Sequence, residues 1–136
     1  MVSNYSGRIN LKKPAAELFA DTAECYAREL QAATNKRINN TTQLRRFYDQ
    51  LVMWDERLSV GTPAQREENF AQAAPFIQML RAQTAYAKGR DLVDSAFVDM
   101  MNELLGQVQD VKTLHMAKLF FEAVMGFKKA MEPKSH

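Results

Sequence analysis

The strongest constraint on the fold of this chain is a helix start at residue 40, where a capping residue leads directly into an apolar stripe. Asn40 is a favoured N-cap residue, and Gln43 falls at the third helical position, close to a capping-box arrangement. Behind the cap, apolar side chains recur on one helical face as far as residue 58, namely Leu44, Phe47, Tyr48, Leu51, Val52 and Leu58. Such a stripe needs partners to cover it, so the segment predicts a helix of the protein core.

Similar patterns along the rest of the chain predict an all-α, single-domain, compact bundle of about five helices. The helices are expected at roughly 14–33, 40–59, 63–88, 91–109 and 110–131, with Asp91 capping the fourth. The second is expected to be central. The third is expected to be kinked or broken near Pro75, because an interior proline removes a backbone hydrogen bond. Residues 1–13 are predicted to be a flexible leader, 14–131 the domain, and 132–136 a frayed tail.

The composition indicates a protein of the reducing cytoplasm with a polyanionic partner. A single cysteine, Cys25, excludes an internal disulfide framework and is expected to be a small buried hydrophobe. No signal-peptide pattern or membrane-spanning apolar run occurs, so the chain is expected to be cytoplasmic with no membrane partner. The net charge is only +2. However, residues 36–46 hold four bases and no acid, whereas residues 91–110 hold five acids and no base.

The sequence does not contain the residue pattern of a catalytic or metal centre. The two histidines, His115 and His136, match no metal-ligand spacing, and His115 is expected to be a surface or helix-packing residue. No local motif pairs Cys25 with a base, and the five glycines are scattered singly rather than forming a phosphate loop. The chain is therefore expected to be no enzyme, with no catalytic residue, metal or cofactor.

The remaining interpretation is a binding module for a polyanion. Bases gather at the start of the second helix, where the exposed backbone N–H groups also favour an anion. Arg46 and Arg57 lie on one line along that helix with Gln50 and Met53 between them. Tyr48 and Tyr86 are expected to be core residues, which leaves no obvious aromatic platform for base stacking. Tracking of a nucleic-acid backbone is therefore the more economical prediction.

Three stretches, in order, resemble the small helical subunit of type III-A (Csm) CRISPR interference complexes. Residues 39–48 (Asn-Asn-Thr-Thr-Gln-Leu-Arg-Arg-Phe-Tyr) are similar to the helix start of that family. Residues 83–90 (Gln-Thr-Ala-Tyr-Ala-Lys-Gly-Arg) resemble its Ala-Tyr-Ala-x-Gly-Arg segment. Residues 118–124 (Lys-Leu-Phe-Phe-Glu-Ala-Val), followed by Phe127 and Lys128, look like its closing helix. The resemblance covers roughly residues 36–130.

This resemblance implies a non-catalytic, all-α scaffold subunit of a ribonucleoprotein that serves antiviral defence. Several copies would stack on one another, contact other CRISPR effector subunits, and line the path of the guide RNA paired with target RNA. A homodimer of the isolated chain is also possible. The RNA-binding positions carried over from the matching motifs are Lys36, Arg37, Arg45, Arg46, Lys88 and Arg90, and charge and helical phase add Arg81.

Two other functions remain open from the sequence. A dimeric helical DNA-binding regulator would use the second helix as a recognition helix, which requires a preceding helix and a tight turn. A helical protein–protein adaptor would bind no nucleic acid.

Overall fold

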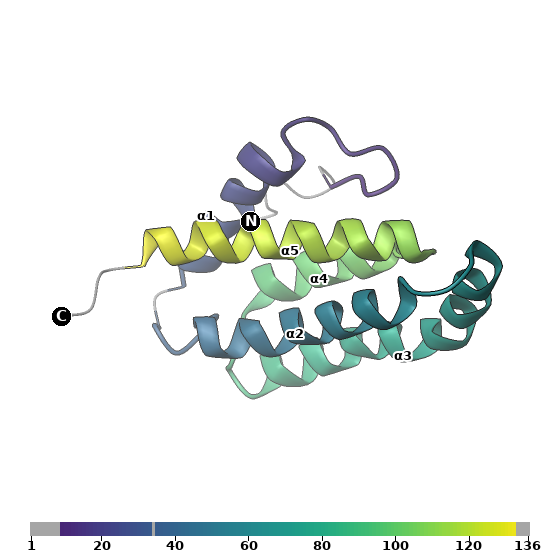
Figure 1. The fold of residues 1–136 in the computed structure, drawn as a ribbon. Coiled ribbons are helices and arrows are strands. Elements are labelled where there is room, and N and C mark those ends of the chain that lie inside the picture. The colour runs from purple at the N-terminus through teal and green to yellow at the C-terminus, as the bar shows by residue number, and fades with distance from the viewer. Residues whose placement is uncertain (1–8, 34, 133–136) are drawn as a thin grey trace.

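The structure, a computed structural model, describes residues 9–33 and 35–132 of the chain (Figure 1). These residues form a short π-helical turn and five α-helices with no strand, which confirms the predicted all-α bundle. Residues 1–8 of the predicted leader and 133–136 of the predicted tail lie outside the described residues. The elements are η1 (Leu18–Thr22), α1 (Ala23–Gln31), α2 (Thr41–Leu58), α3 (Pro63–Gly89), α4 (Ser95–Gln107) and α5 (Val111–Met131).

Side-chain caps define where α2, α3, α4 and α5 begin. The Asn40 side chain accepts a hydrogen bond from the Gln43 backbone N–H at 2.9 Å, as predicted for the start of α2. A capping box between Thr62 and Gln65 begins α3, with Pro63 as its first residue. Gly61 precedes this cap at a φ of +93°, where an added Cβ would come within 2.7 Å of the Gln65 Oε1. Glycine is therefore required in the turn between α2 and α3.

Two predicted helices differ in their details from the structure. α4 is capped by Asp94, whose side chain accepts from the Phe97 N–H, and not by Asp91. Asp91 instead adopts a left-handed φ of 59° in the turn after α3, which ends at Gly89. At the first helix, regular α-structure begins only at Ala23, after the π-helical turn. This turn shifts the side-chain phase, so Leu18 is buried while Phe19 is 37% exposed.

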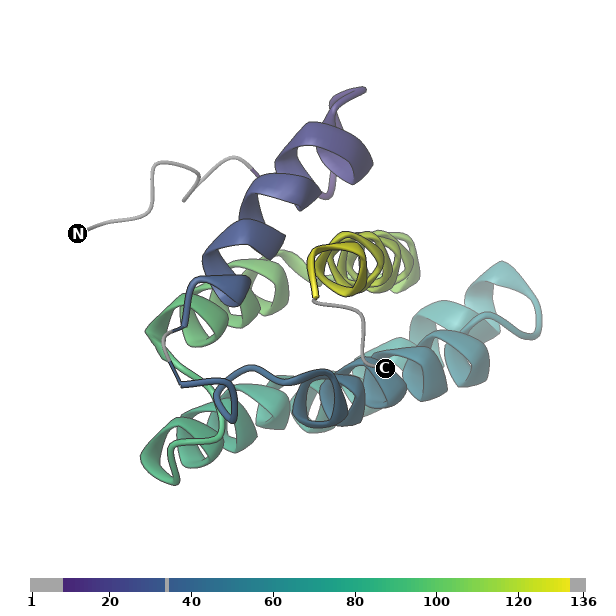
Figure 2. The same ribbon diagram turned by 90° about the vertical axis from the view of Figure 1, so that its left-hand side faces the viewer.

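The helix at the centre of the bundle is α5 rather than α2. Figure 2 looks along α5 and shows α1, α4 and the α2–α3 pair arranged around it. The backbone of α5 lies close to that of every other helix, whereas the backbone of α2 lies close only to those of α5 and α3. The reason lies in its sequence, because apolar residues cover most of its circumference, and Leu114, Ala117, Phe120, Phe121 and Val124 are all fully buried.

Aromatic contacts join the helices around this centre. The Phe97 ring of α4 lies 5.3 Å from Phe47 of α2 and 5.9 Å from Phe121 of α5, centroid to centroid. Tyr26 of α1 meets Phe120 edge-on at 5.4 Å. Distances in this range are favourable for aromatic pairs, so the rings fix four helices relative to one another. α3 runs without interruption through Pro75 and packs on α2, α4 and α5.

Residues 9–11, within the segment predicted as a leader, pack on α4. Ile9 and Leu11 are buried in the core. The Gln107 side chain donates to the Ile9 carbonyl and accepts from the Leu11 N–H, both at 2.8 Å. The division of the chain into leader, domain and tail remains a prediction. Among the helices that the structure describes, none is long and apolar enough to cross a membrane.

Asn39 connects three parts of the bundle that are distant in sequence. It is completely buried and has a left-handed φ of 61°. Its side chain donates to the Leu30 carbonyl at the end of α1, at 3.2 Å, and accepts from the Asp94 N–H at the start of α4, at 3.1 Å. Its own N–H donates to the Leu92 carbonyl at 3.0 Å. Asn39 therefore positions the loop that leads into α2.

Truncation of the α2 stripe should destabilise the protein strongly. Leu44, Phe47 and Leu51 are buried as predicted, so replacing any one by Ala should lower the free energy of unfolding by about 2–5 kcal/mol. Val60 is 63% exposed and serves as a control, since Val60→Ala should change it by less than about 0.5 kcal/mol. Urea unfolding followed by circular dichroism measures both. Equal effects for Leu51→Ala and Val60→Ala would contradict the assignment.

Removal of the Asn39 side chain should also destabilise the fold. Asn39→Gly preserves the left-handed backbone but leaves the buried Leu30 carbonyl and Asp94 N–H without their partner, which should cost about 2–4 kcal/mol. Asn35→Gly is the matched control, because Asn35 is exposed and its side chain bonds only the nearby Arg37 N–H. A similarly small destabilisation by both variants in urea unfolding would show that the Asn39 contacts contribute little.

Candidate nucleic-acid interface

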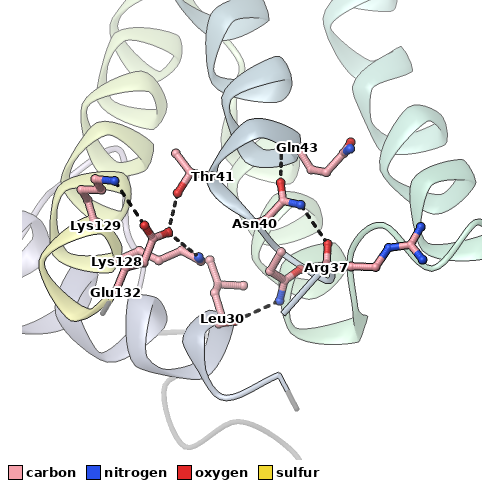
Figure 3. A network of polar contacts seen from close by, with 9 residues as sticks. Leu30, Arg37, Asn40, Thr41, Gln43, Lys128, Lys129 and Glu132 are labelled. Carbon is pink, nitrogen blue, oxygen red and sulfur yellow. Dashed lines mark hydrogen bonds and ion pairs between the residues drawn. The ribbon is translucent and has the colours of Figure 1, made fainter. Parts of the chain in front are cut away.

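The amino end of α2 already holds a carboxylate from the end of α5. The Thr41 hydroxyl donates to Glu132 at 2.5 Å, and the Lys128 and Lys129 ammonium groups lie 3.4 Å from the same carboxylate. Figure 3 shows Glu132 between the two lysines and Thr41, with the Arg37 side chain pointing away from them. The anion site predicted at this helix start is thus partly occupied by an internal group.

These contacts lower the pKa of the Glu132 carboxyl from its ordinary value of 4.5. The hydrogen bond from Thr41 is the largest cause, and the nearby charge of Lys128 adds to it against the opposing effect of burial. Because its partners favour the charged form, Glu132 stays an anion at neutral pH. On this side of α2, Lys128 and Lys129 are therefore already paired with a carboxylate of the protein itself.

The seven predicted RNA-binding residues are all exposed to solvent, namely Lys36, Arg37, Arg45, Arg46, Arg81, Lys88 and Arg90. Within residues 9–33 and 35–132, none of them forms an ion pair with a carboxylate. Their polar side-chain contacts are to neutral groups, such as the side-chain carbonyl oxygen of Asn102, 3.1 Å from the Arg81 Nε. Their positive charge is thus not neutralised inside the protein and remains available to an anion.

Two of these residues meet at a groove between α2 and α3. Arg46 comes from α2 and Arg90 follows the last turn of α3. The groove has a volume of about 590 Å³ and contains no acidic residue; its lining is Gln43, Arg46, Phe47, Gln50, Ala82, Gln83, Tyr86, Ala87, Arg90 and Leu92. α2 and α3 run side by side in both views of the fold (Figures 1 and 2), and the groove lies between residues 43–50 of α2 and residues 82–92 at and beyond the end of α3.

The other five predicted residues do not line this groove. Lys36 and Arg37 lie in the loop that Asn39 ties to the turn between α3 and α4. Arg45 is on a neighbouring face of α2. Arg81 contacts α4 through Asn102, and Lys88 lies two turns further along the same flank of α3. The structure thus divides the predicted site into the groove pair, the loop pair, and three separate bases.

Tyr86 is not the core residue that its sequence position suggested. It is 67% exposed at the rim of the groove, and the Arg90 guanidinium carbon lies 5.8 Å from its ring centroid. Gln83 was also missed; its side chain accepts from the Gln50 amide at 3.3 Å across the groove. Helical phase gave no clear signal, because Gln83, Tyr86 and Arg90 share their face of α3 with Phe76 and Met79, which are apolar but exposed.

Tyr48, in contrast, packs against the core as predicted. Its ring lies 5.8 Å from that of Phe121, and its hydroxyl donates to Glu122 at 3.0 Å. Burial, followed by the neighbouring carboxylate, raises the pKa of Tyr48 to about 12. Its hydroxyl therefore remains protonated at any physiological pH.

The remaining polar groups of the described chain serve packing. His115 is a helix-packing residue, with its Nδ1 3.0 and 3.1 Å from the two carboxylate oxygens of buried Asp55. Cys25 is half-buried. A second hollow of about 560 Å³ lies where α3 and α5 begin, but Glu67 and Asp110 there balance Arg66 and Lys112. Over residues 9–33 and 35–132, no group of three or more His, Cys, Asp or Glu side chains could hold a metal ion.

Comparison with models of protein families gives a match to the family described as Csm2 Type III-A, over residues 13–134. The matched range contains all five α-helices and all seven basic residues of the predicted site. No curated protein and no solved structure matches the chain.

Acid should weaken the contact between Glu132 and α2. A carboxyl whose pKa is lowered in the folded protein contributes stability above its ordinary pKa of 4.5, and that contribution is lost as pH falls through the lowered value. Glu132→Gln should therefore be less stable than the wild type at pH 7, by less than about 1 kcal/mol, and the difference should shrink towards pH 3. Urea unfolding at pH 7, 5 and 3 checks this.

Glu24→Gln is the control for this measurement, since Glu24 forms only an exposed pair with Arg28. It should change the free energy of unfolding little at neutral pH. A difference between Glu132→Gln and wild type that is the same at pH 7 and pH 3 would show that the ionised carboxylate is not responsible.

Proposed function

The chain belongs to the Csm2 Type III-A family, and from this membership we propose that it is a non-catalytic, RNA-binding scaffold subunit of a type III-A CRISPR complex. The family makes it a small subunit of that complex. The finer parts of the proposal are that the chain lines the path of guide and target RNA, stacks in several copies, and serves antiviral defence in the cytoplasm.

The observation that carries the proposal is the set of exposed bases without acidic partners. Arg46 and Arg90 flank a groove free of carboxylates, and Lys36 and Arg37 lie on the loop beside the end of α3. Arginine and lysine in such positions bind phosphates without reading sequence. This is the chemistry that a subunit needs if it follows an RNA backbone whose sequence differs from one guide to the next.

The position of Glu132 supports the same direction of approach. On the α5 side of the α2 start, Glu132 already pairs with Lys128 and Lys129, whereas the groove on the α3 side holds Arg46 and Arg90 without an acidic residue in its lining. The RNA backbone would therefore pass over the α2–α3 face.

Stacking between copies is supported by charge, although less strongly than the sequence suggested. In the acidic block 91–110, Asp94 and Asp110 cap helices, and Glu103 accepts a hydrogen bond from the Tyr26 hydroxyl. Asp91 and Asp99 remain exposed and can face a basic surface of a neighbouring copy.

The DNA-binding alternative fits the structure less well. A helix-turn-helix places its two helices at the ends of a turn of three or four residues. Here residues 32–40 separate α1 from α2, and Asn39 fixes this connection against α4. No observation favours the adaptor alternative, which the following test distinguishes by its lack of RNA binding.

Reversal of charge at the start of α2 should weaken RNA capture. The double variant Arg45→Glu, Arg46→Glu, in the assembled complex, should bind target RNA less tightly. It should also lower the slope of log affinity against log salt by about 0.7–0.9 for each phosphate that the protein no longer neutralises. Both side chains are exposed, so circular dichroism should show unchanged helicity. Filter binding at several salt concentrations measures the effect.

The matched control is Arg66→Glu, Lys112→Glu, which makes the same change in net charge at the charge-balanced hollow. It should leave target-RNA binding close to that of the wild type. RNA binding that both double variants retain equally would refute the proposed function and favour an adaptor.

A further inference from the structure

We propose that the groove between α2 and α3 binds one unpaired RNA base, which stacks on Tyr86 while Arg46 and Arg90 hold the phosphates on either side. This inference rests on the proposed function and adds to it a specific subsite. Backbone tracking needs only cations. The groove offers, in addition, an aromatic ring and side-chain amides.

Tyr86 has the properties of a stacking platform. Its ring is 67% exposed, although it belongs to a well-packed helix pair. Arg90 lies against it, with the guanidinium carbon 5.8 Å from the ring centroid and the Nη1 3.3 Å from the hydroxyl. This contact holds the tyrosine side chain in one orientation and leaves most of its surface open. Bases of any sequence stack on such rings because every base has a π-face.

The groove has the size and the lining for a nucleoside. Its volume of about 590 Å³ lies within the usual range of small-molecule sites, roughly 300–1,000 Å³. Phe47, Ala87 and Leu92 give it an apolar part, and the two arginines give it a positive rim. A charged ligand without an apolar part would leave the apolar residues uncovered, and an apolar peptide would leave the two arginines without an anion.

Two side-chain amides can meet the edge of the bound base. Gln50 and Gln83 are joined across the groove by one long hydrogen bond of 3.3 Å. Each amide presents both donors and an acceptor, so together they can exchange this bond for bonds to any base edge. Such adaptable contacts fit a site that must accept different bases at successive guides.

The ligand must be an unpaired nucleotide. Bases inside an A-form duplex are stacked and offer only their edges in the grooves, so they cannot reach a ring on a protein surface. A base that has left the stack presents both faces and its pairing edge. The site therefore binds a nucleotide that is displaced from the guide–target duplex, or one that lies beyond its end.

Photochemical cross-linking in the assembled complex tests this directly. Target RNAs would carry a single 4-thiouridine at successive positions, and mass spectrometry would identify the cross-linked peptide. We expect Tyr86 to cross-link at particular positions only. Phe76→Ala is the control, because Phe76 is an exposed aromatic residue of α3 that is not part of the groove lining. That variant should leave the cross-link to Tyr86 unchanged.

Affinity measurements show whether the base itself contributes. Replacing the nucleotide at the cross-linked position by an abasic one should weaken binding to the wild-type complex about tenfold, as expected when one base no longer stacks on an aromatic ring. The complex with Tyr86→Ala should bind both RNAs with the same, weaker affinity. Tyr86→Phe keeps the ring and should behave like the wild type.

The outcomes separate this inference from the proposed function. Normal target binding without a cross-link to Tyr86, or equal affinity of the wild type for intact and abasic RNA, would overturn the base site alone. So would a decrease in affinity with Tyr86→Phe as large as with Tyr86→Ala, or a cross-link from Tyr86 to another protein. RNA binding that survives Arg45→Glu, Arg46→Glu unchanged would overturn the proposed function and this inference with it.

Discussion

The buried side chain of Asn39 is the contact on which the arrangement of the candidate interface depends. Three backbone groups, from the end of α1 and the turn before α4, find their hydrogen-bond partners on this one residue. Buried backbone groups without partners are costly, so the loop cannot move away without replacing all three bonds. The bonds also fix the loop against the turn that follows α3. As a result, Lys36 and Arg37 lie beside the same end of α3 that carries Arg90, although these residues are far apart in the sequence.

A second constraint is the ion cluster on the opposite side of α2. Helix α5 is long enough for Glu132 to reach Thr41, and the Thr41 hydroxyl, together with Lys128 and Lys129, keeps that carboxylate ionised. The start of α2 favours negative charge, and Glu132 already supplies part of that charge from within the protein. On the α5 side the lysines are paired with Glu132, whereas on the α3 side Arg46 and Arg90 line a groove without an acidic residue. The unpaired positive charge available to a polyanion therefore lies on the α3 side.

The sequence predicted the features that depend on residues a few positions apart. The N-cap Asn40 and the buried stripe of α2 follow from local spacing, and the structure confirms them. The features that it could not predict depend on distant partners. The local sequence around Asn39 predicts only a turn. Its burial and its bond to Asp94 depend on the packing of segments that are distant in the sequence. Tyr86 reads as core because aromatic residues usually are, and its exposure follows from how α2 lies across α3. The central position of α5 was missed because a helix that is apolar over most of its circumference can either lie inside a bundle or dock on a partner.

The rigidity of the groove has a consequence for how such a subunit contributes to RNA binding. The Phe47–Phe97 contact fixes the α2 wall to α4, and the α3 wall also packs on α4, so a ligand finds the groove already formed and little conformational entropy is lost on binding. A single groove with two arginines nevertheless holds few phosphates, and its affinity alone is weak at physiological salt. If several copies line one RNA, as proposed, each further copy would bind the same RNA at a high effective concentration. A rigid, weak and repeated site suits a scaffold that must hold any target tightly once it is paired, yet release single contacts readily.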